Sequence, residues 1–349
     1  MSQLARGTSG PVFLCRSPTG QLKRFVLMQR MRVNATILLV VLTCAARLGA
    51  QTLPSGVINV PPTVIGDNQS IGSDTTLNVF DGGVVGDGFQ AGLGDGSSNN
   101  IEVNISGGEI GTSFLLGKNS IANISGGTID RGFRADQGSI VNVSGGEIKD
   151  VITLSGSTAN ISGGDVGGDL KAFSSMINIS GGNVQHGFQA ESGNTVNISG
   201  GSVGSAFTST LFNTINLSGG SVGNLFELRG TNTLNISGGT IGTRFSANEG
   251  SMIDIVGSEF YLDGVLIDLE PDVKTLLPDR DVQLSGVLAD GTPFEFDLFS
   301  TRIRGEDFVA DSAVLTLTLV PEPSTIALCL LAAIAGRRRA QRFVRPAHR

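Results

Sequence analysis

The stretch Asn104-Ile105-Ser106-Gly107-Gly108 decides the fold of this chain, because the same phrase returns at an almost fixed interval. From this copy onward its first residue recurs after steps of 19, 19, 18, 18, 19, 19, 19 and 19 residues. A short unit of this kind cannot bury its apolar residues alone, so the repetition predicts a stack of equivalent coils. The phrase opens at Asn78, Asn104, Asn123, Asn142, Asn160, Asn178, Asn197, Asn216 and Asn235, and in a degenerate copy at Asp254.

Apolar residues occupy fixed places around the Asn of each copy. They lie directly before and after it, six places on, and ten and twelve places on, as in Val103, Ile105, Ile110, Phe114 and Leu116. Alternation of this kind is typical of strands with one buried face. We therefore expect three short strands per copy. Turns that need positive φ are expected at three places between these strands. They are the Gly-Gly pair, the usual Gly at the seventh place, and the Gly, Ser or Asn near the end of each copy.

The predicted fold class is all-β, a β-solenoid or parallel β-helix of about ten rungs with 18 or 19 residues each, over residues 77–257. At ~4.8 Å per rung the rod would be roughly 50 Å long. Either handedness fits the unit length. A disordered Gly-, Ser- and Asn-rich segment is the alternative, but disorder does not require an apolar residue at one phase of every copy.

The flanks of the repeat carry different patterns. Residues 51–76 are expected to form an extended lead-in that becomes the first strand or cap of the rod, and residues 258–320 a separate small β unit that closes the rod. Within that unit, residues 282–288 and 293–299 around the turn at 289–292 predict a β-hairpin, and residues 313–320 predict a last strand.

The first 50 residues are predicted to be a secretory signal peptide. They contain no acidic residue, and a basic cluster precedes the apolar run 35–46. Cleavage is expected between Ala50 and Gln51. Translation from Met31 would leave a leader of ordinary length.

The other end of the chain carries a second export signal. Val320-Pro321-Glu322-Pro323 is followed by the apolar segment 326–335 and then by Arg337-Arg338-Arg339. This arrangement resembles the PEP-CTERM proteins of Gram-negative bacteria, whose C-terminal signal is a Pro-Glu-Pro motif, a membrane-spanning helix and a basic cluster. The resemblance covers residues 321–342, with Val320 directly before them, and a basic tail, 343–349, follows.

The resemblance implies processing near Pro321-Glu322-Pro323 by a membrane-embedded sorting enzyme of the exosortase type. The protein would be held transiently at the inner membrane by a C-terminal hydrophobic helix, with Arg337, Arg338 and Arg339 on the cytoplasmic side. Its destination would be the cell surface or the extracellular matrix. One departure is the length of the apolar run with its flanks, 324–336, which spans ~20 Å as a helix against a hydrocarbon core of ~30 Å.

Removal of both ends changes the charge of the protein. All 31 acidic residues lie between residues 51 and 323, but only 11 of the 24 basic residues do, so the exported part carries a formal charge of about −20 instead of −7. Such a body repels nucleic acid and anionic glycans unless divalent cations bridge them, and we expect no nucleic acid as a partner. The three cysteines, Cys15, Cys44 and Cys329, fall outside the exported part, which excludes a cysteine nucleophile or Cys-ligated zinc there.

Two groups of acidic residues are candidates for chemistry. Glu147 and Asp165 occupy the fifth place after Asn in successive copies, and paired carboxylates about 5 Å apart suit a retaining glycosidase. The alternative is a polar outer column in which Glu, Asp, Asn, Ser and Thr interchange. Asp81, Asp87 and Asp95 lie in a Gly-rich stretch that could offer oxygen ligands to Ca²⁺. Their spacing fits neither the EF-hand loop nor the nonapeptide Gly-Gly-x-Gly-x-Asp repeat, which favours a plain acidic loop and no cofactor.

These observations predict an exported structural or matrix protein without enzymatic activity and without catalytic residues. Two alternatives stay open: a β-helix polysaccharide lyase or hydrolase that uses the outer carboxylates, and an adhesin that binds extracellular polysaccharide.

Overall fold

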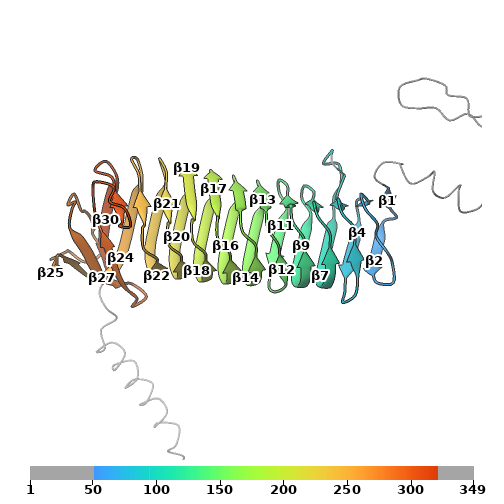
Figure 1. The fold of residues 1–349 in the computed structure, drawn as a ribbon, viewed down its shortest axis with the longest axis horizontal. Helices are drawn as coiled ribbons and strands as arrows, with labels where there is room; N and C mark the ends of the chain where they lie inside the picture. The colour runs from blue at the N-terminus through green and yellow to red at the C-terminus, as the bar shows by residue number, and fades with distance from the viewer. Residues whose placement is uncertain (1–50, 94, 321–349) are drawn as a thin grey trace, which may run out of the picture. The chain divides into compact units, whose positions relative to one another are not determined.

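The computed structural model describes residues 51–93 and 95–320. Within these residues the chain winds into about eleven turns of stacked parallel coils. The coils follow one another in chain order along one axis (Figure 1). The described residues contain strands and no α-helix. The all-β solenoid predicted from the repeat is therefore confirmed.

Each coil contributes one strand to a short-strand sheet of 12 strands. Equivalent residues of neighbouring coils pair in register, for example Ala172 with Ala190. The sheet consists of β1 (Thr52–Leu53), β3 (Ser70–Ile71), β6 (Gln90–Ala91), β8 (Leu115–Leu116), β10 (Phe133–Ala135), β13 (Ile152–Ser155), β15 (Leu170–Phe173), β17 (Gln189–Ser192), β19 (Thr208–Leu211), β21 (Glu227–Leu228), β23 (Ser246–Ala247) and β29 (Phe308–Val309).

The repeated Asn phrase forms a second parallel sheet, the long-strand sheet. Here Asn pairs with Asn and the following Ile with Ile, as in Asn160↔Asn178 and Ile161↔Ile179. Its strands are β2 (Gly56–Val60), β4 (Thr75–Val79), β5 (Val84–Val85), β7 (Ile101–Ile110), β9 (Ile121–Ile129), β11 (Ile140–Val143), β12 (Glu147–Ile148), β14 (Thr158–Val166), β16 (Met176–Val184), β18 (Thr195–Val203), β20 (Thr214–Val222), β22 (Thr233–Ile241), β24 (Met252–Leu262) and β30 (Val314–Leu319).

The expectation of three separate strands per coil is wrong for most coils. In β14, for example, the chain runs from Thr158 to Val166 as one strand, and the ladder to the next coil shifts register between Ile161 and Asp165. The Ser-Gly-Gly segment is therefore a β-bulge that bends a continuous strand. Only where the pairing is interrupted, as between β11 and β12, does the segment separate two strands.

The two glycines of the phrase are required for different reasons. Gly201 takes a φ of +70°, the left-handed region that glycine favours. Gly200 does not, but a Cβ added to it would lie 2.4 Å from the carbonyl oxygen of Ser180 in the coil below. At the seventh place, a Cβ on Gly204 would lie 2.8 Å from the backbone of Gln185. Close approach between coils, and not positive φ, therefore explains the first and third of these glycines.

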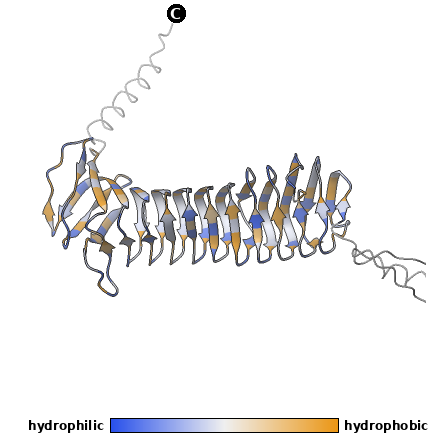
Figure 2. Cartoon of the chain, turned by 90° about the horizontal axis from the view of Figure 1, so that it is seen from above, coloured by the Kyte–Doolittle hydropathy of each residue, from blue (hydrophilic) through white to orange (hydrophobic). Residues whose placement is uncertain are grey.

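The core is the interior of the coil stack. The five apolar places predicted to face inward are buried in nearly every coil, and Figure 2 shows the resulting alternation of hydrophobic and hydrophilic positions along the strands. Phe188, Phe207 and Phe226 stack with ring centroids 4.4 Å and 4.7 Å apart. The Phe column predicted from the tenth place is therefore confirmed. It is interrupted by Ile152 and Leu170, which are buried at the same place.

The stack begins earlier than the repeat phrase indicated. The strand β2 lies within the expected lead-in 51–76, yet it pairs in register with β4, so that Asn59 lies beside Asn78. Ile58-Asn59-Val60 is thus another copy of the phrase. It was missed because Pro61 and Pro62 follow it where Ser-Gly-Gly follows the others.

The stack also ends later than residue 257. The strand β30, expected in a separate unit, pairs in parallel with β24 and places Thr316 beside Asp254. Leu315 and Leu317 are buried like the apolar residues that flank each Asn. This copy was missed because Thr replaces Asn and because the residues between β24 and β29 interrupt the 19-residue period.

The interrupting segment folds as antiparallel strands. The hairpin predicted over 282–299 is present as β27 (Gln283–Leu288) and β28 (Pro293–Asp297), and β27 also pairs with the second half of β24. The strand β25 (Val265–Leu266) pairs with the end of β24, and β26 (Lys274–Leu276) pairs with β30. The ring centroid of Phe296 in the hairpin lies 5.5 Å from that of Phe245, so Phe296 extends the Phe column.

Candidate functional site

A ladder of Asn side chains runs along the outside of the long-strand sheet. Each Asn donates its Nδ2 hydrogen to the Oδ1 of the Asn one coil earlier, for example from Asn160 to Asn142 at 2.9 Å and from Asn178 to Asn160 at 2.8 Å. The nine bonds connect all ten Asn residues from Asn59 to Asn235. The repeated Asn therefore has a structural role, which is to bind one coil to the next.

The ladder ends at Asp254 because a carboxylate has no hydrogen to donate to Asn235. Instead, Asp254 accepts a hydrogen bond from Lys274 Nζ at 2.6 Å and another from the hydroxyl of Thr316. The charge that replaces the amide is thus paired by the segment that follows the repeat.

A second polar column lies inside the stack, three places before the Asn of each copy from Asn123 to Asn235 and before Asp254. Asn213 is representative: its Nδ2 donates to the carbonyl of Ala190 at 2.9 Å, and its Oδ1 accepts from the backbone N of Asn194 at 2.8 Å. Except for Ser157, whose Oγ has no hydrogen-bond partner among the described residues, these side chains bind backbone groups at a corner of the coil. The sequence pattern predicts the Ser or Asn near the end of each copy only as a turn residue, and it does not predict these buried hydrogen bonds. The buried members of the column are Ser120, Ser139, Ser157, Ser175, Asn194, Asn213, Asn232 and Ser251.

The carboxylate pair considered for catalysis is brought together. Glu147 and Asp165 are direct partners in neighbouring coils, and both are exposed. Asp165 accepts a hydrogen bond from Asn183 at 3.3 Å, and Asn183 in turn accepts one from Ser202 at 2.8 Å. The column is therefore a line of interacting polar side chains in which the two carboxylates are consecutive members.

The three aspartates considered for Ca²⁺ are not brought together. Asp87 accepts a hydrogen bond from the backbone N of Thr112 at 2.7 Å, and Asp95 accepts two from Ser97 within its own turn. The Ser97 bonds lower the pKa of Asp95 below its ordinary value. Within the described ranges no three His, Cys, Asp or Glu residues group in a way that could hold a metal ion.

Most residues predicted for the two export signals lie outside the described residues. These are Ala50, Pro321, Glu322, Pro323, Arg337, Arg338 and Arg339. The two that are described lie at the ends of the stack. The carbonyl of Gln51 accepts a hydrogen bond from Ser70 N at 2.9 Å, and Val320 N donates to the carbonyl of Gly257 at 2.8 Å. Both predicted processing points therefore fall next to residues that are hydrogen-bonded into a coil.

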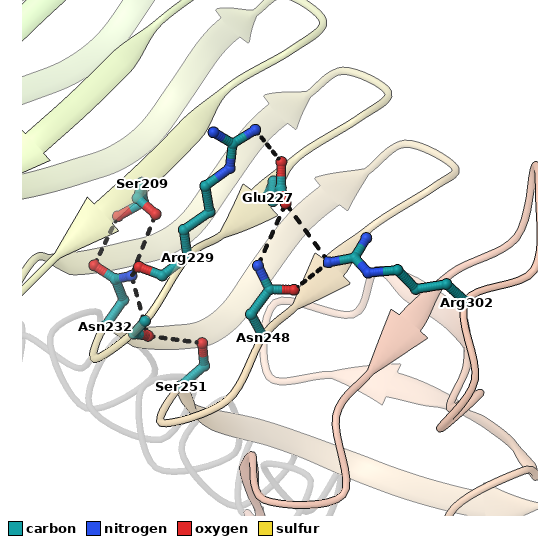
Figure 3. Close-up of polar contacts among 8 residues, drawn as sticks. Ser209, Glu227, Arg229, Asn232, Asn248, Ser251 and Arg302 are labelled. Carbon is teal, nitrogen blue, oxygen red and sulfur yellow. Dashed lines mark hydrogen bonds and ion pairs between the residues drawn. The ribbon is translucent and has the colours of Figure 1, made fainter.

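The structure assembles a polar group that sequence reasoning did not find. This seam cluster consists of Glu227, Arg229, Asn248 and Arg302, and it lies where residues 300–308 pack against the last coils (Figure 3). Glu227 Oε2 accepts from Arg229 at 2.7 Å, and its Oε1 lies 3.7 Å from Arg302. Asn248 donates to Glu227 at 3.3 Å and accepts from Arg302. Arg302 also lies over the ring of Phe308, 4.4 Å from its centroid.

Opposing effects set the ionisation of Glu227. Burial raises its pKa, but the hydrogen bond and charge of Arg229, with smaller contributions from Asn248 and Arg302, hold the pKa below its ordinary value. The same hydrogen bond raises the pKa of Arg229. Glu227 is therefore ionised and paired at neutral pH, which leaves it unsuited to act as a general acid.

Two clefts adjoin the seam cluster and share Arg302 and Phe308. The small cleft, of 180 Å³, is lined by Glu227, Ser246 and Glu306 together with the arginines Arg244, Arg302 and Arg304. The large cleft, of 620 Å³, is lined mainly by polar residues: Asn248, Glu249, Ser300, Asp311 and Ser312.

The chain has no match among protein-family models, curated proteins or solved structures. In the part of the chain that the structure describes, no helix is long and apolar enough to cross a membrane.

Proposed function

We propose that this protein is an exported structural component of the cell surface or extracellular matrix of a Gram-negative bacterium. The observation that carries the proposal is the unbroken Asn ladder from Asn59 to Asn235, in which nine hydrogen bonds join successive coils. A side chain that is used in ten successive coils, from Asn59 to Asn235, to hold the neighbouring coil suits a rod whose purpose is its length and stiffness.

The antiparallel segment after the repeat supports this role as a cap. Its strand β26 pairs with the outer side of β30, and Phe296 covers Phe245 at the end of the Phe column. A pairing strand at the open edge blocks uncontrolled end-to-end association. The rod would therefore be a unit of limited length and not a subunit that adds indefinitely at this end.

Export and sorting form the second part of the proposal. A signal peptidase would cut between Ala50 and Gln51, and an exosortase-type enzyme would cut near Pro321-Glu322-Pro323 after transient anchoring in the inner membrane. Strand pairing runs to Leu319, so a cut near Pro321-Glu322-Pro323 would leave every described coil intact. Extracellular polysaccharide is the proposed surrounding partner.

Mass spectrometry of the protein recovered from the cell surface tests this part. We expect a new N-terminus at Gln51 and a new C-terminus close to Pro321-Glu322-Pro323. Recovery of the chain with Arg337 to Arg339 still attached would contradict processing at the sorting signal. A substitution such as Glu322→Ala should cause the unprocessed chain to accumulate in the membrane fraction.

The alternative function is a polysaccharide lyase or hydrolase, favoured by the adjacency of Glu147 and Asp165 in neighbouring coils. It requires that Glu147→Gln and Asp165→Asn abolish glycan cleavage while the far-ultraviolet circular dichroism of the rod is unchanged. Cleavage that persists in both variants would exclude this pair as the catalytic site.

A further inference from the structure

The small cleft places three arginines beside two glutamates, Glu227 and Glu306, which is a local excess of positive charge in a protein that as a whole repels anions. Of the 11 basic residues between residues 51 and 323, three line this cleft: Arg244, Arg302 and Arg304. Arg302 is already paired with Glu227 and Asn248. Arg244 and Arg304 form no ion pair with any other described residue, including Glu306 of the same cleft, so both guanidinium groups are available to an anion.

A buried hydroxyl in the same cleft lacks a partner. Ser246 is only 8% exposed, lines the small cleft, and its Oγ forms no hydrogen bond with any described residue. Ser246 faces away from the core, because its neighbours Phe245 and Ala247 point inward. Leaving a buried hydroxyl unsatisfied is costly, and a ligand oxygen in the cleft would remove that cost.

The adjoining large cleft has a different chemistry. It is lined by the amide of Asn248, the hydroxyls of Ser300 and Ser312 and the carboxylates of Glu249 and Asp311, with Phe308 and Ala310 as its apolar surface. Groups of this kind bind sugar hydroxyls. Because the two clefts share Arg302 and Phe308, one linear ligand can extend from the cationic cleft into the hydroxyl-binding one.

From this juxtaposition we infer that the seam between residues 300–312 and the last coils binds an acidic polysaccharide. A uronate carboxylate lies between Arg244 and Arg304 and accepts a hydrogen bond from the hydroxyl of Ser246, and the next sugar occupies the large cleft. An acidic peptide supplies the same carboxylate but no ring of hydroxyls for the large cleft, so a glycan is the better match. The scaffold role proposed above does not depend on this site.

Isothermal titration calorimetry on the purified full-length chain tests the inference. The probes are trigalacturonate, the neutral trigalactose and a triglutamate peptide. We expect binding of trigalacturonate that weakens as salt is added, and no binding of trigalactose. Arg304→Gln should weaken trigalacturonate binding about tenfold, as loss of a charge-assisted hydrogen bond does. Ser246→Ala should weaken it by a smaller factor.

The matched control is Arg131→Gln, because Arg131 is an exposed arginine of an earlier coil, 71% exposed and distant in sequence from the seam. It removes the same charge from the rod and should leave the affinity unchanged. The inference is overturned if trigalacturonate does not bind, if Arg131→Gln weakens binding as much as Arg304→Gln, or if triglutamate binds more tightly than trigalacturonate. The last result would assign the cleft to an acidic peptide.

Discussion

The Phe column is the part of the core whose contribution can be tested most sharply, and Phe207→Ala is the perturbation of choice. Phe207 is fully buried, and its ring lies 4.4 Å from that of Phe188 and 4.7 Å from that of Phe226. Removing a buried Phe side chain costs about 3–5 kcal/mol, and each lost ring pair adds about 0.5–1.5 kcal/mol. We expect Phe207→Ala to lower the free energy of unfolding by at least 3 kcal/mol, in line with the lower bound of about 3 for such sites.

A milder substitution at the same position separates the energetic cost of lost side-chain volume from the cost of lost ring stacking. Ile152 and Leu170 occupy this column in other coils, so the site accepts an aliphatic side chain. Phe207→Leu should therefore cost only about 1–3 kcal/mol, chiefly for the two lost ring contacts at about 0.5–1.5 kcal/mol each. Urea unfolding followed by far-ultraviolet circular dichroism gives both values.

Phe212 provides the control, because it is the same residue type in the same coil. It is 68% exposed and has a φ of +55°. Phe212→Ala should change the free energy of unfolding by less than about 0.5 kcal/mol. The reasoning is refuted if Phe207→Ala costs less than about 1 kcal/mol, or if Phe212→Ala costs as much as Phe207→Ala.

Three further predictions follow from glycine geometry and from ionisation, all measured as free energies of unfolding. Gly201→Ala should cost more than about 2 kcal/mol, because its Cβ would lie 2.7 Å from backbone atoms of the coil below, whereas Gly264→Ala, with similar φ and open space, should cost about 1 kcal/mol. Equal costs would exclude the contact between coils as the cause. Burial raises the pKa of Asp307 above its ordinary 3.8. The stability that the protonated carboxyl contributes is fully present below pH 3.8 and is lost as the pH rises through the raised pKa. As the pH rises from 3.8 through the raised pKa, the free energy of unfolding of Asp307→Asn should therefore increase relative to that of the unchanged protein. A constant difference would contradict this. For Glu227, burial raises the pKa, but the hydrogen bond and charge of Arg229 more than offset this, so the pKa is lowered. The stability that ionised Glu227 contributes is therefore present above pH 4.5 and lost as the pH falls through the lowered pKa. The cost of Glu227→Gln should be largest at about pH 7 and become smaller in acid.

Much of the stack could be predicted from the sequence, because every regular coil repeats the same inward residues at the same phase. The register of Asn160 beside Asn178 follows directly from the interval. The end coils could not be predicted in this way. Asn59 is followed by prolines in place of Ser-Gly-Gly, and Thr316 replaces Asn after a long insertion. These two copies therefore lack the repeated sequence phrase but keep the strand pairing of the stack.

The seam cluster could not be predicted for a related reason. Arg302 and Arg304 belong to a segment with no repeat phase, so nothing in the sequence places them beside Glu227 or Ser246. The burial of Ser246 depends on that segment as well, since the equivalent residue of the preceding coil, Glu227, is only partly buried. Only the fold brings these side chains together.

The central claim is that the rod is a scaffold and not an enzyme, and one assay tests it directly. The purified protein is incubated with bacterial and algal polysaccharides, with and without Ca²⁺, and new reducing ends and unsaturated sugar ends are measured. We predict no release above the buffer control from protein whose circular dichroism shows the β fold. Release that is lost in Glu147→Gln or Asp165→Asn, with the fold retained, would contradict the claim.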